Sequence, residues 1–402
     1  MRILYIHQYF LIPSESAATR SYWISQELIR RGHHVIMLSA TGKRHEEGVE
    51  MIDGIEVHYV KNPYANYMST LRKLWSFLRF IRQAIQEAKK IKNVDLVYAT
   101  STPLTVGYIA MRIKSRFKIP YVFEVRDLWP EFPIQIGAIR NKLAIKYLKN
   151  LEKRIYNHSE FVVALSPGML EGVVSTGFPA EKTVMIPNMS KPDNFFPHDP
   201  DPETEVKFDI DRSCFNVIYF GSMGRANGLE YIIEAARICV DRGADDIRFI
   251  FLGSGTTEPV LRKMVQNYNL QNVSFFPKQN LFTVAEVVNC CDISIISFKN
   301  LPILQTNSPN KLFDSLSAGK PIIVNSAGWT KDLVESEHCG FYVDPDNPSE
   351  LAAKLIEVKD NKYLLSEWGT NARRLSVEKY DQKVLTSRVA DVLEEVYSQL
   401  LK

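Results

Sequence analysis

Two segments in the second half of the chain have residue types that can bind a phosphate. The first is Phe220-Gly-Ser-Met-Gly-Arg-Ala-Asn-Gly-Leu229, between a predicted strand and a predicted helix. Gly221, Gly224 and Gly228 permit a sharp turn and a close backbone approach to a ligand, and the helix start offers free N–H groups. Arg225 adds a cation that can hold phosphate through two N–H groups. The alternative is an ordinary strand–helix turn. The spacing is not G-x-G-x-x-G, so an NAD-dependent enzyme is not favoured.

The second segment is Thr306–Pro321, which reads as a short capped helix. Ser308 is a favoured N-cap residue, Pro309 a favoured first helical residue, and Gly319 a usual residue just beyond a helix end. The helix is therefore expected to begin near Pro309 and to stop before Gly319.

Two charged residues make this helix a candidate pyrophosphate site. Lys311 lies in the first turn, where a cation is unfavourable for the helix dipole unless an anion is also bound. A pyrophosphate would satisfy both Lys311 and the free N–H groups. Asp314 lies three residues later on roughly the same face and can accept hydrogen bonds from ribose hydroxyls. The alternative is a core helix with solvated polar residues.

In the first half, polar residues follow predicted strands at their carboxyl ends. The segment Glu124-Val-Arg-Asp-Leu-Trp-Pro130 is one such run. Asp127 can orient or deprotonate an acceptor hydroxyl within hydrogen-bond reach, whereas Arg126 stays protonated and cannot act as a base. Arg20 can contact an acceptor phosphate, and His7 can line the same site. The alternatives are a mutually paired structural cluster, a solvated arginine and a satisfied histidine at a strand end.

Short apolar runs alternate with amphipathic helical patterns through both halves, which indicates parallel strands covered by helices. The predicted strands are Arg2–His7, Val35–Ser39, Ile55–Val60, Leu96–Thr100, Tyr121–Glu124, Phe161–Leu165, Asn216–Phe220, Ile247–Leu252, Val273–Phe276, Ile293–Ser297 and Pro321–Val324. A proline-rich segment, Pro187–Arg212, reads as a linker. The expected fold is α/β with two Rossmann-like doubly wound domains facing a central cleft, over residues 1–190 and 191–380. Residues 381–402 are expected to form a C-terminal helix that packs back on the first domain.

Charge is distributed unevenly. Residues 1–190 hold 26 Lys and Arg against 16 Asp and Glu, and residues 191–402 hold 23 against 30. Residues 61–92 hold eight basic residues and one acid, with aromatic and aliphatic residues at helical spacing, as in a helix that lies on a membrane surface. Residues 112–118 add four cations. The alternative is a domain helix with a solvated basic face. No nucleic-acid-binding signature accompanies these bases, so nucleic acid is not an expected partner.

The remaining composition favours a reduced protein without a metal site. Five cysteines without a C-x-x-C pair argue against disulfides and zinc. Three D-x-D triplets lie in or beside the linker or before a helix, so no metal is expected. No run approaches the roughly 18 apolar residues of a membrane span, and no signal peptide is visible. We therefore expect a cytoplasmic protein that is peripheral to the inner membrane.

Several motifs together resemble glycosyltransferase family 4, which has the GT-B fold, and in particular the L-fucosamine transferase branch of bacterial surface-polysaccharide synthesis. The motifs are Ile6-His-Gln-Tyr-Phe10, Thr19-Arg-Ser-Tyr-Trp23, Glu124-Val-Arg-Asp-Leu-Trp-Pro130 and Ser308-Pro-Asn-Lys311. The resemblance covers essentially the whole chain. Where the family has two glutamates, this chain has Thr306 and Asp314, and where it often has Arg and Lys at the glycine turn, this chain has Ser222 and Asn227. Ala17 and Ala18 replace the usual Gly-Gly of the acceptor loop.

The resemblance implies a retaining enzyme that moves a sugar, such as N-acetyl-L-fucosamine or a related N-acetylhexosamine, from a UDP-sugar to an undecaprenyl-diphosphate-linked glycan in O-antigen or capsule synthesis. The resemblance also implies that this enzyme uses no cofactor. Charge on the leaving diphosphate would be stabilised by Arg225, Lys311 and the helix dipole. The expected donor-binding residues are Gly221, Ser222, Gly224, Asn227, Lys278, Thr306, Asn307, Ser308, Pro309, Asn310 and Asp314. The expected acceptor-binding residues are His7, Ala17, Ala18, Arg20 and Glu124, and the expected catalytic residues are Asp127, Arg126, Arg225 and Lys311.

Two other functions stay open. A sugar-nucleotide epimerase of the same fold would need acid and base side chains around the sugar, and no convincing pair is present. A nucleotide-sugar-binding protein without catalysis would fit the missing glutamates. Product formation from the nucleotide sugar alone would identify the epimerase, and tight donor binding without turnover would identify the binding protein.

Overall fold

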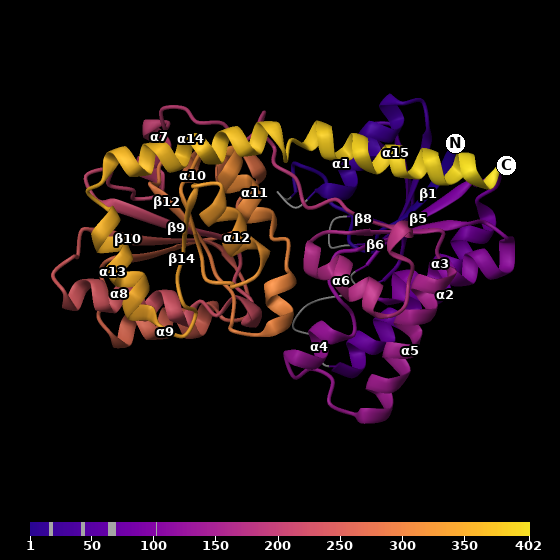
Figure 1. The fold of residues 1–402 in the computed structure, drawn as a ribbon, viewed down its shortest axis with the longest axis horizontal. Coiled ribbons are helices and arrows are strands. Elements are labelled where there is room, and N and C mark those ends of the chain that lie inside the picture. Colours follow the sequence, from indigo (N-terminus) through magenta and orange to yellow (C-terminus); the bar gives the residue numbers. More distant parts are fainter. Residues whose placement is uncertain (16–18, 42–44, 63–69, 102) are drawn as a thin grey trace. The chain divides into compact units, whose positions relative to one another are not determined.

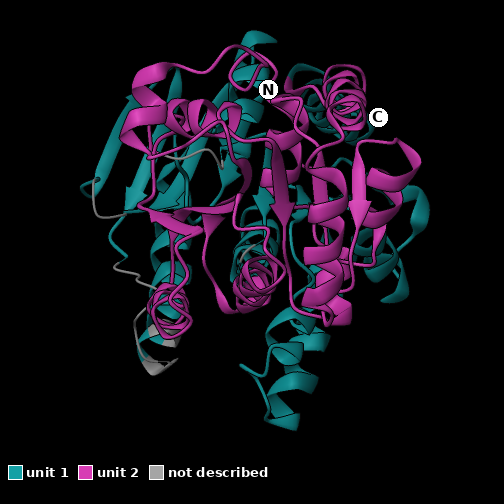
Figure 2. Cartoon of the chain, turned by 90° about the vertical axis from the view of Figure 1, so that its left-hand side faces the viewer, with its two compact units in different colours: residues 1–12, 19–187, 383–402 teal, residues 13–18, 188–382 magenta. Residues whose placement is uncertain are grey.

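A computed structural model of the 402-residue chain describes all residues except 16–18, 42–44, 63–69 and 102. The chain forms two compact units, coloured separately in Figure 2. Unit 1 comprises Met1–Ile12, Thr19–Pro187 and Lys383–Lys402, and unit 2 comprises Pro13–Ala18 and Asn188–Gln382. Each unit is a twisted sheet with helices on both faces.

The sheet of unit 1 has the strand order β3-β4-β2-β1-β5-β6-β7-β8 and is parallel except for β3, which pairs antiparallel with β4. The central strands are buried along their length, as expected for parallel strands covered on both faces. The strands are β1 (Arg2–Ile6), β2 (His34–Ala40), β3 (Gly48–Ile52), β4 (Ile55–Val60), β5 (Leu96–Thr100), β6 (Tyr121–Val125), β7 (Phe161–Ala164) and β8 (Thr183–Met185).

The helices of unit 1 lie on the two sides of this sheet. Figure 1 shows α1 and α15 on one side and α2, α3, α5 and α6 on the other. The helices are α1 (Arg20–Arg30), α2 (Thr70–Lys90), α3 (Thr105–Phe117), α4 (Glu131–Gln135), α5 (Lys142–His158), α6 (Pro167–Ser175), η1 (Ala180–Lys182) and α15 (Gln382–Leu400). Among the helices of the described residues, none is both long enough and apolar enough to cross a membrane.

The sheet of unit 2 is fully parallel, with the strand order β11-β10-β9-β12-β13-β14. Its strands are β9 (Phe215–Ser222), β10 (Ile247–Ser254), β11 (Val273–Phe276), β12 (Ile293–Ile296), β13 (Ile322–Val324) and β14 (Gly340–Tyr342). Its helices are α7 (Pro202–Lys207), η2 (Arg225–Asn227), α8 (Glu230–Asp241), α9 (Glu258–Asn267), α10 (Leu281–Asn289), η3 (Pro302–Thr306), α11 (Asn310–Ser317), α12 (Trp329–Ser336), α13 (Pro348–Val358) and α14 (Lys362–Glu378).

All eleven predicted strands are present, with ends that differ by two residues at most. Three further strands, β3, β8 and β14, were not predicted. The segment Pro187–Arg212 is not the loose linker that its prolines suggest, because it includes α7, and Asn188, Ser190 and Lys191 are buried against α11. From Asn188 onward this segment belongs to unit 2.

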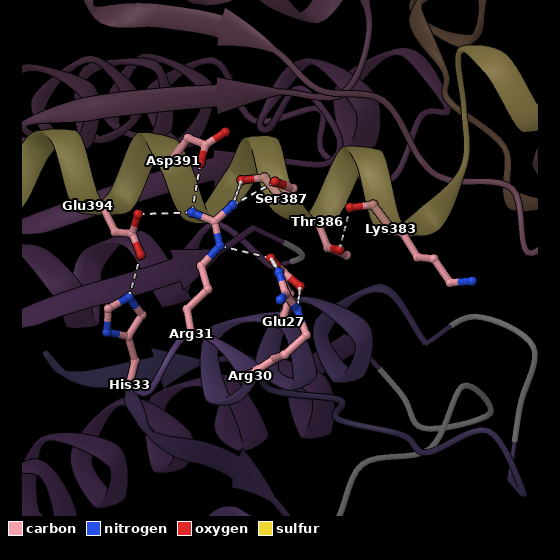
Figure 3. Close-up of polar contacts among 9 residues, drawn as sticks. All are labelled: Glu27, Arg30, Arg31, His33, Lys383, Thr386, Ser387, Asp391 and Glu394. Atoms are coloured by element: carbon pink, nitrogen blue, oxygen red, sulfur yellow. Dashed lines mark hydrogen bonds and ion pairs between the residues drawn. The ribbon is translucent and has the colours of Figure 1, made fainter.

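The C-terminal helix α15 completes unit 1. Arg31, just after α1, donates through Nη1 to Asp391 at 2.7 Å and Glu394 at 2.9 Å, and through Nη2 to Ser387 Oγ at 2.6 Å (Figure 3). His33 Nε2 lies 2.7 Å from Glu394 Oε1. These contacts join α15 to the α1–β2 connection, and they are stronger together than a single exposed ion pair.

Candidate functional site

In unit 2, the glycine turn begins at the carboxyl end of β9. Gly221 has φ +119°, a conformation that L side chains rarely adopt. The neighbouring strand β10 approaches so closely that a Cβ on Gly253 would lie 1.9 Å from the Gly221 carbonyl oxygen. The two strands therefore approach each other closely at the glycine pair Gly221 and Gly253. Gly221 and Ser222 remain exposed.

Helix α11 begins beside this turn, one residue later than expected. It starts at Asn310, and Pro309 is its N-cap residue without a side-chain cap. The prediction that Ser308 caps the helix is wrong, because its Oγ accepts the N–H of Asn188 at 3.2 Å. The N–H groups of Asn310 and Lys311 consequently have no side-chain cap among the described residues, whereas the N–H of Leu312 bonds to the Pro309 carbonyl at 3.1 Å. The helix ends as predicted, with Gly319 at φ +61° and the N–H of Lys320 bonded to the carbonyl of Ser315.

Lys311 extends from the first turn of α11 over the end of β9. Its Nζ lies 3.7 Å from the centroid of the Tyr219 ring, and 3.6 Å from where a Cβ on Gly221 would stand. No carboxylate of the described residues pairs with Lys311, and burial of its ammonium lowers its pKa to about 7, although the residue as a whole is only partly buried. The structure thus brings Lys311 and the glycine turn together, around a cation that an anionic ligand would stabilise.

Asp314 does not share the environment of Lys311, contrary to the prediction that both face one ligand. Its Oδ1 pairs with Nζ of Lys191, and both side chains are almost fully buried. Burial raises the pKa of Asp314, and Lys191 opposes that shift. Since one oxygen is occupied and the residue is buried, this placement gives Asp314 an internal ion pair and does not support a contact with a ribose.

The other predicted donor-binding residues of unit 2 lie in the segments that follow β9, β11 and β12. Asn227 donates through Nδ2 to the Ser222 carbonyl at 2.9 Å and so closes the turn. Arg225 is exposed and has no side-chain partner among the described residues. Lys278 is exposed just after β11. Thr306, Asn307 and Asn310 lie in the segment from η3 to the start of α11. The Thr306 hydroxyl donates to the Ile303 carbonyl at 2.8 Å, and Trp329 Nε1 donates to the Asn307 carbonyl at 2.7 Å.

In unit 1, three predicted residues follow the carboxyl ends of β1 and β6, the two strands on either side of β5. His7 follows β1, and its Nδ1 lies 2.6 Å from Thr100 Oγ1 at the end of β5. Burial, and to a smaller extent the charge of Arg126, lowers the pKa of His7 to about 3, so the imidazole is neutral. Arg126 follows β6, and its N–H bonds to Ser101 Oγ at 2.8 Å. Asp127 is half-buried beside it. These polar groups form the candidate acceptor side of unit 1.

Arg20 and Glu124 have a different role from the predicted one. Arg20 Nε donates to Glu124 Oε2 at 3.0 Å, and its two terminal nitrogens donate to the carbonyls of Ile186 and Pro187. Tyr98 donates to the same carboxylate oxygen at 2.6 Å. Both charged side chains are almost fully buried. Arg20 is therefore not available to a phosphate, and the pair is internal. Ala17 and Ala18 lie outside the described residues.

Sequence reasoning missed three relevant residues. Lys191 was hidden in the proline-rich segment, and only its long-range pairing identifies it. Tyr219 precedes the glycine turn by two residues, so strand alternation places it on the same side as Gly221. Gln8, next to His7, is fully buried, and both polar atoms of its side chain lack a partner among the described residues. The described residues contain no group of three or more His, Cys, Asp or Glu that could hold a metal.

Models of two protein families match the chain. A "Glycosyl transferase 4-like domain" matches residues 17–189, and "Glycosyl transferases group 1" matches residues 202–375. A relative from Escherichia coli strain K12, "Putative colanic acid biosynthesis glycosyl transferase WcaI", is 26% identical over 58% of this chain and 56% of its own. The chain thus spans little more than half of that relative's length.

Two further proteins match over most of the chain. An alpha-monoglucosyldiacylglycerol synthase of Acholeplasma laidlawii is 21% identical over 84% of this chain and 88% of its own. Among solved structures, Alr3699/HepE of Anabaena, in complex with UDP and glucose, superimposes with a TM-score of 0.72 over 98% of this chain and 99% of its own, at 18% identity. At that identity, this likeness establishes the fold.

Proposed function

Because the chain belongs to glycosyltransferase family 4, whose GT-B fold has two Rossmann-like domains, we propose that it transfers a sugar from a UDP-sugar to a lipid-linked glycan at a membrane surface. The main observation in favour is Lys311, which lies beside the Gly221 turn with no carboxylate partner in the described part of the chain, within the region matched by the group 1 domain. The uracil base is proposed from the HepE complex with UDP.

Binding of the donor would use the start of α11. A diphosphate placed there accepts the uncapped N–H groups and pairs with Lys311, which then regains its charge because an adjacent anion raises its pKa. Gly221 leaves room for this contact, since it has no side chain between the strand end and Lys311. Arg225 supplies a second cation from the exposed turn.

The chemistry would depend on charge stabilisation more than on a protein base. The acceptor hydroxyl oxygen bonds to the anomeric carbon, the bond from that carbon to the diphosphate breaks, and the hydroxyl proton passes to a diphosphate oxygen on the same face. This sequence retains the anomeric configuration. Lys311, Arg225 and the α11 dipole stabilise the negative charge of the leaving diphosphate. In unit 1, Arg126, Asp127 and the neutral His7 orient the acceptor.

A membrane surface is proposed for unit 1 because basic and apolar side chains are exposed together. Trp75 and Leu78 on α2 are 73% and 52% exposed, and Arg72, Arg79 and Arg82 are exposed on the same helix. Ser76, Phe80, Ala84 and Ala88 form the face of α2 that packs inward. Exposed aromatic and basic side chains on one helix are typical of binding to anionic lipid. Within residues 61–92, positions 63–69 lie outside the described residues.

The finer identity of the substrates follows from the sequence motifs and from two relatives. We propose N-acetyl-L-fucosamine or a related N-acetylhexosamine as the sugar and an undecaprenyl-diphosphate-linked glycan as the acceptor, for O-antigen or capsule synthesis on the cytoplasmic face of the inner membrane. WcaI is named for colanic acid biosynthesis and the Acholeplasma relative for a glycosylated lipid, which supports this choice of acceptor class.

The decisive experiment measures thermal stability of the purified chain with nucleoside diphosphates, with and without magnesium. We expect UDP to raise the melting temperature without magnesium, because a ligand that binds only the folded state stabilises it. Lys311→Met should abolish this shift and lower turnover of UDP-sugar with a lipid-linked acceptor by about 100-fold or more. Lys263→Met, which removes an exposed lysine from α9 in the same unit, should change neither.

Three outcomes would contradict the proposal. An unchanged UDP shift in Lys311→Met would remove Lys311 from the donor site. Product formed from the nucleotide sugar alone would indicate an epimerase. Tight UDP-sugar binding without transfer to any lipid-linked acceptor would indicate a binding protein.

A further inference from the structure

A cavity of about 330 Å³ opens on unit 1 where α3 and α5 end. Five of the residues that line it are basic, namely Arg112, Lys114 and Lys118 from α3 and its C-cap, and Arg154 and His158 from α5. None of these residues belongs to the candidate acceptor side of unit 1 described above.

The cavity lies at the opposite end of the parallel strands from His7 and Arg126. Helix α3 ends at Phe117, shortly before β6 begins at Tyr121, and α5 ends at His158, shortly before β7 begins at Phe161. The cavity therefore lies near the amino ends of β6 and β7, whereas the candidate acceptor residues follow the carboxyl ends of parallel strands. It is a separate site within unit 1.

Positive charge at this cavity exceeds what its surroundings neutralise. Lys114 Nζ donates to the His158 carbonyl at 2.8 Å and pairs with Glu160, so it holds the two helix ends together. Arg112, Lys118 and Arg154 are exposed, and their side chains have no hydrogen bond or ion pair to the described residues. The carboxyl ends of two helices contribute roughly half a negative charge each. Four cationic side chains, one carboxylate and two helix ends still leave about two positive charges.

We propose that this cavity binds a phosphate group. Two arginines and a lysine from different helix ends can surround one phosphate, because guanidinium groups bind its oxygens in pairs and the ammonium adds a point charge. A phosphate monoester has a charge of roughly −1.5 to −2 at neutral pH, which matches the excess at the site. The same chemistry is found in a lipid headgroup and in a soluble phosphate.

A lipid headgroup in the cavity would need apolar side chains beside it for its acyl chains. Near its start, α5 exposes Leu143 and Tyr147 on the same helical face as Arg154 and His158. Helix α3 packs beside α2, which exposes Trp75 and Leu78. These apolar side chains lie near the starts of α5 and α2, whereas the cavity lies where α3 and α5 end, so they do not select between a lipid headgroup and a soluble phosphate.

The test compares two double variants of the full chain that remove the same charge. Arg112→Gln with Arg154→Gln empties the cavity of its unpaired arginines, and Lys142→Gln with Lys146→Gln removes two exposed cations from the start of α5. Binding is measured by sedimentation with phosphatidylcholine vesicles that contain phosphatidic acid or, at equal surface charge, phosphatidylserine. In parallel, inorganic phosphate is titrated while the melting temperature is recorded.

We expect the cavity variant to lose about tenfold or more in affinity for phosphatidic acid vesicles, and the control variant to lose clearly less. Loss of the stabilisation by inorganic phosphate with unchanged vesicle binding would still support the cavity, with a soluble phosphate as its ligand. Equal loss of vesicle binding in both variants, together with the same phosphate stabilisation as the unmodified chain, would overturn the proposal. Melting temperatures without ligand check that both variants fold.

Discussion

Arg20 in unit 1 and Lys311 in unit 2 are two cations held away from water, and they differ in their partners. Arg20 has a carboxylate and two carbonyls within hydrogen-bond distance. Burial alone would lower the pKa of Arg20, but Glu124 beside it raises it. Among the described residues, Lys311 lies against the face of Tyr219 and pairs with no carboxylate, and burial lowers its pKa to about 7. A buried cation with a complete set of partners makes the fold depend on those partners, whereas a cation without them can be stabilised by an anionic ligand.

The largest expected effect is the loss of stability when the Arg20–Glu124 pair is broken. Glu124→Gln leaves the guanidinium without its counter-charge inside unit 1, and such a loss typically costs about 3–5 kcal/mol. Urea unfolding monitored by tryptophan fluorescence measures this change in free energy. Glu181→Gln, at an exposed position of η1, is the control and should stay within about 0.5 kcal/mol. A loss in Glu124→Gln no larger than the control's would mean that the pair contributes no net stability.

Two pH dependences of opposite sign are expected from Lys311. In the free protein, its pKa is lowered from 10.5 to about 7. Between pH 7 and 10 the unfolded chain therefore binds more protons at this lysine, and the stability of the unmodified chain relative to Lys311→Met should rise with pH. UDP binding requires the protonated amine, so the affinity for UDP should fall by up to about tenfold per pH unit above pH 7.

Isothermal titration calorimetry from pH 7 to 9 measures how the affinity for UDP depends on pH. Proton uptake on binding measures the protonation of Lys311 independently. A flat affinity across this range would show that Lys311 does not change its protonation when the nucleotide binds.

The smallest expected effect concerns α15. Arg31→Ala removes contacts to Ser387, Asp391 and Glu394 together and should destabilise unit 1 by about 1–2 kcal/mol. Asp391→Ala removes one ion pair, in which the carboxylate itself is exposed, and should cost at most about 0.5 kcal/mol. Thermal unfolding of the two variants compares them. If they lose the same stability, the several bonds of Arg31 do not act together.

Local patterns predicted most of the fold. Buried strands of both units are continuous apolar runs, and the end of α11 at Gly319 follows from one glycine at positive φ. The strands that were missed have weaker signals: β3 is an exposed antiparallel edge strand, and β8 and β14 have three residues each. The glycine turn and Lys311 were also identified from neighbouring residues alone.

The errors share a cause, which is pairing over long sequence separation. Ser308 was assigned to the helix cap, but Asn188, 120 positions away, takes its hydroxyl. Asp314 was assigned to a ligand, but Lys191 pairs with it across 123 positions. Arg20 and Glu124 are 104 positions apart. A local pattern shows that a polar side chain is present, and only the fold determines whether another residue already satisfies it.

The assignment of Lys383–Lys402 to unit 1 has a consequence for synthesis of the chain. Domains generally fold as units while the chain is made, beginning from the N-terminus. Here the helix that supplies Ser387, Asp391 and Glu394 to Arg31 is translated after unit 2 (Figure 3). Every residue of unit 2 is therefore translated before unit 1 has its full set of contacts, so unit 1 begins its folding first and completes it last.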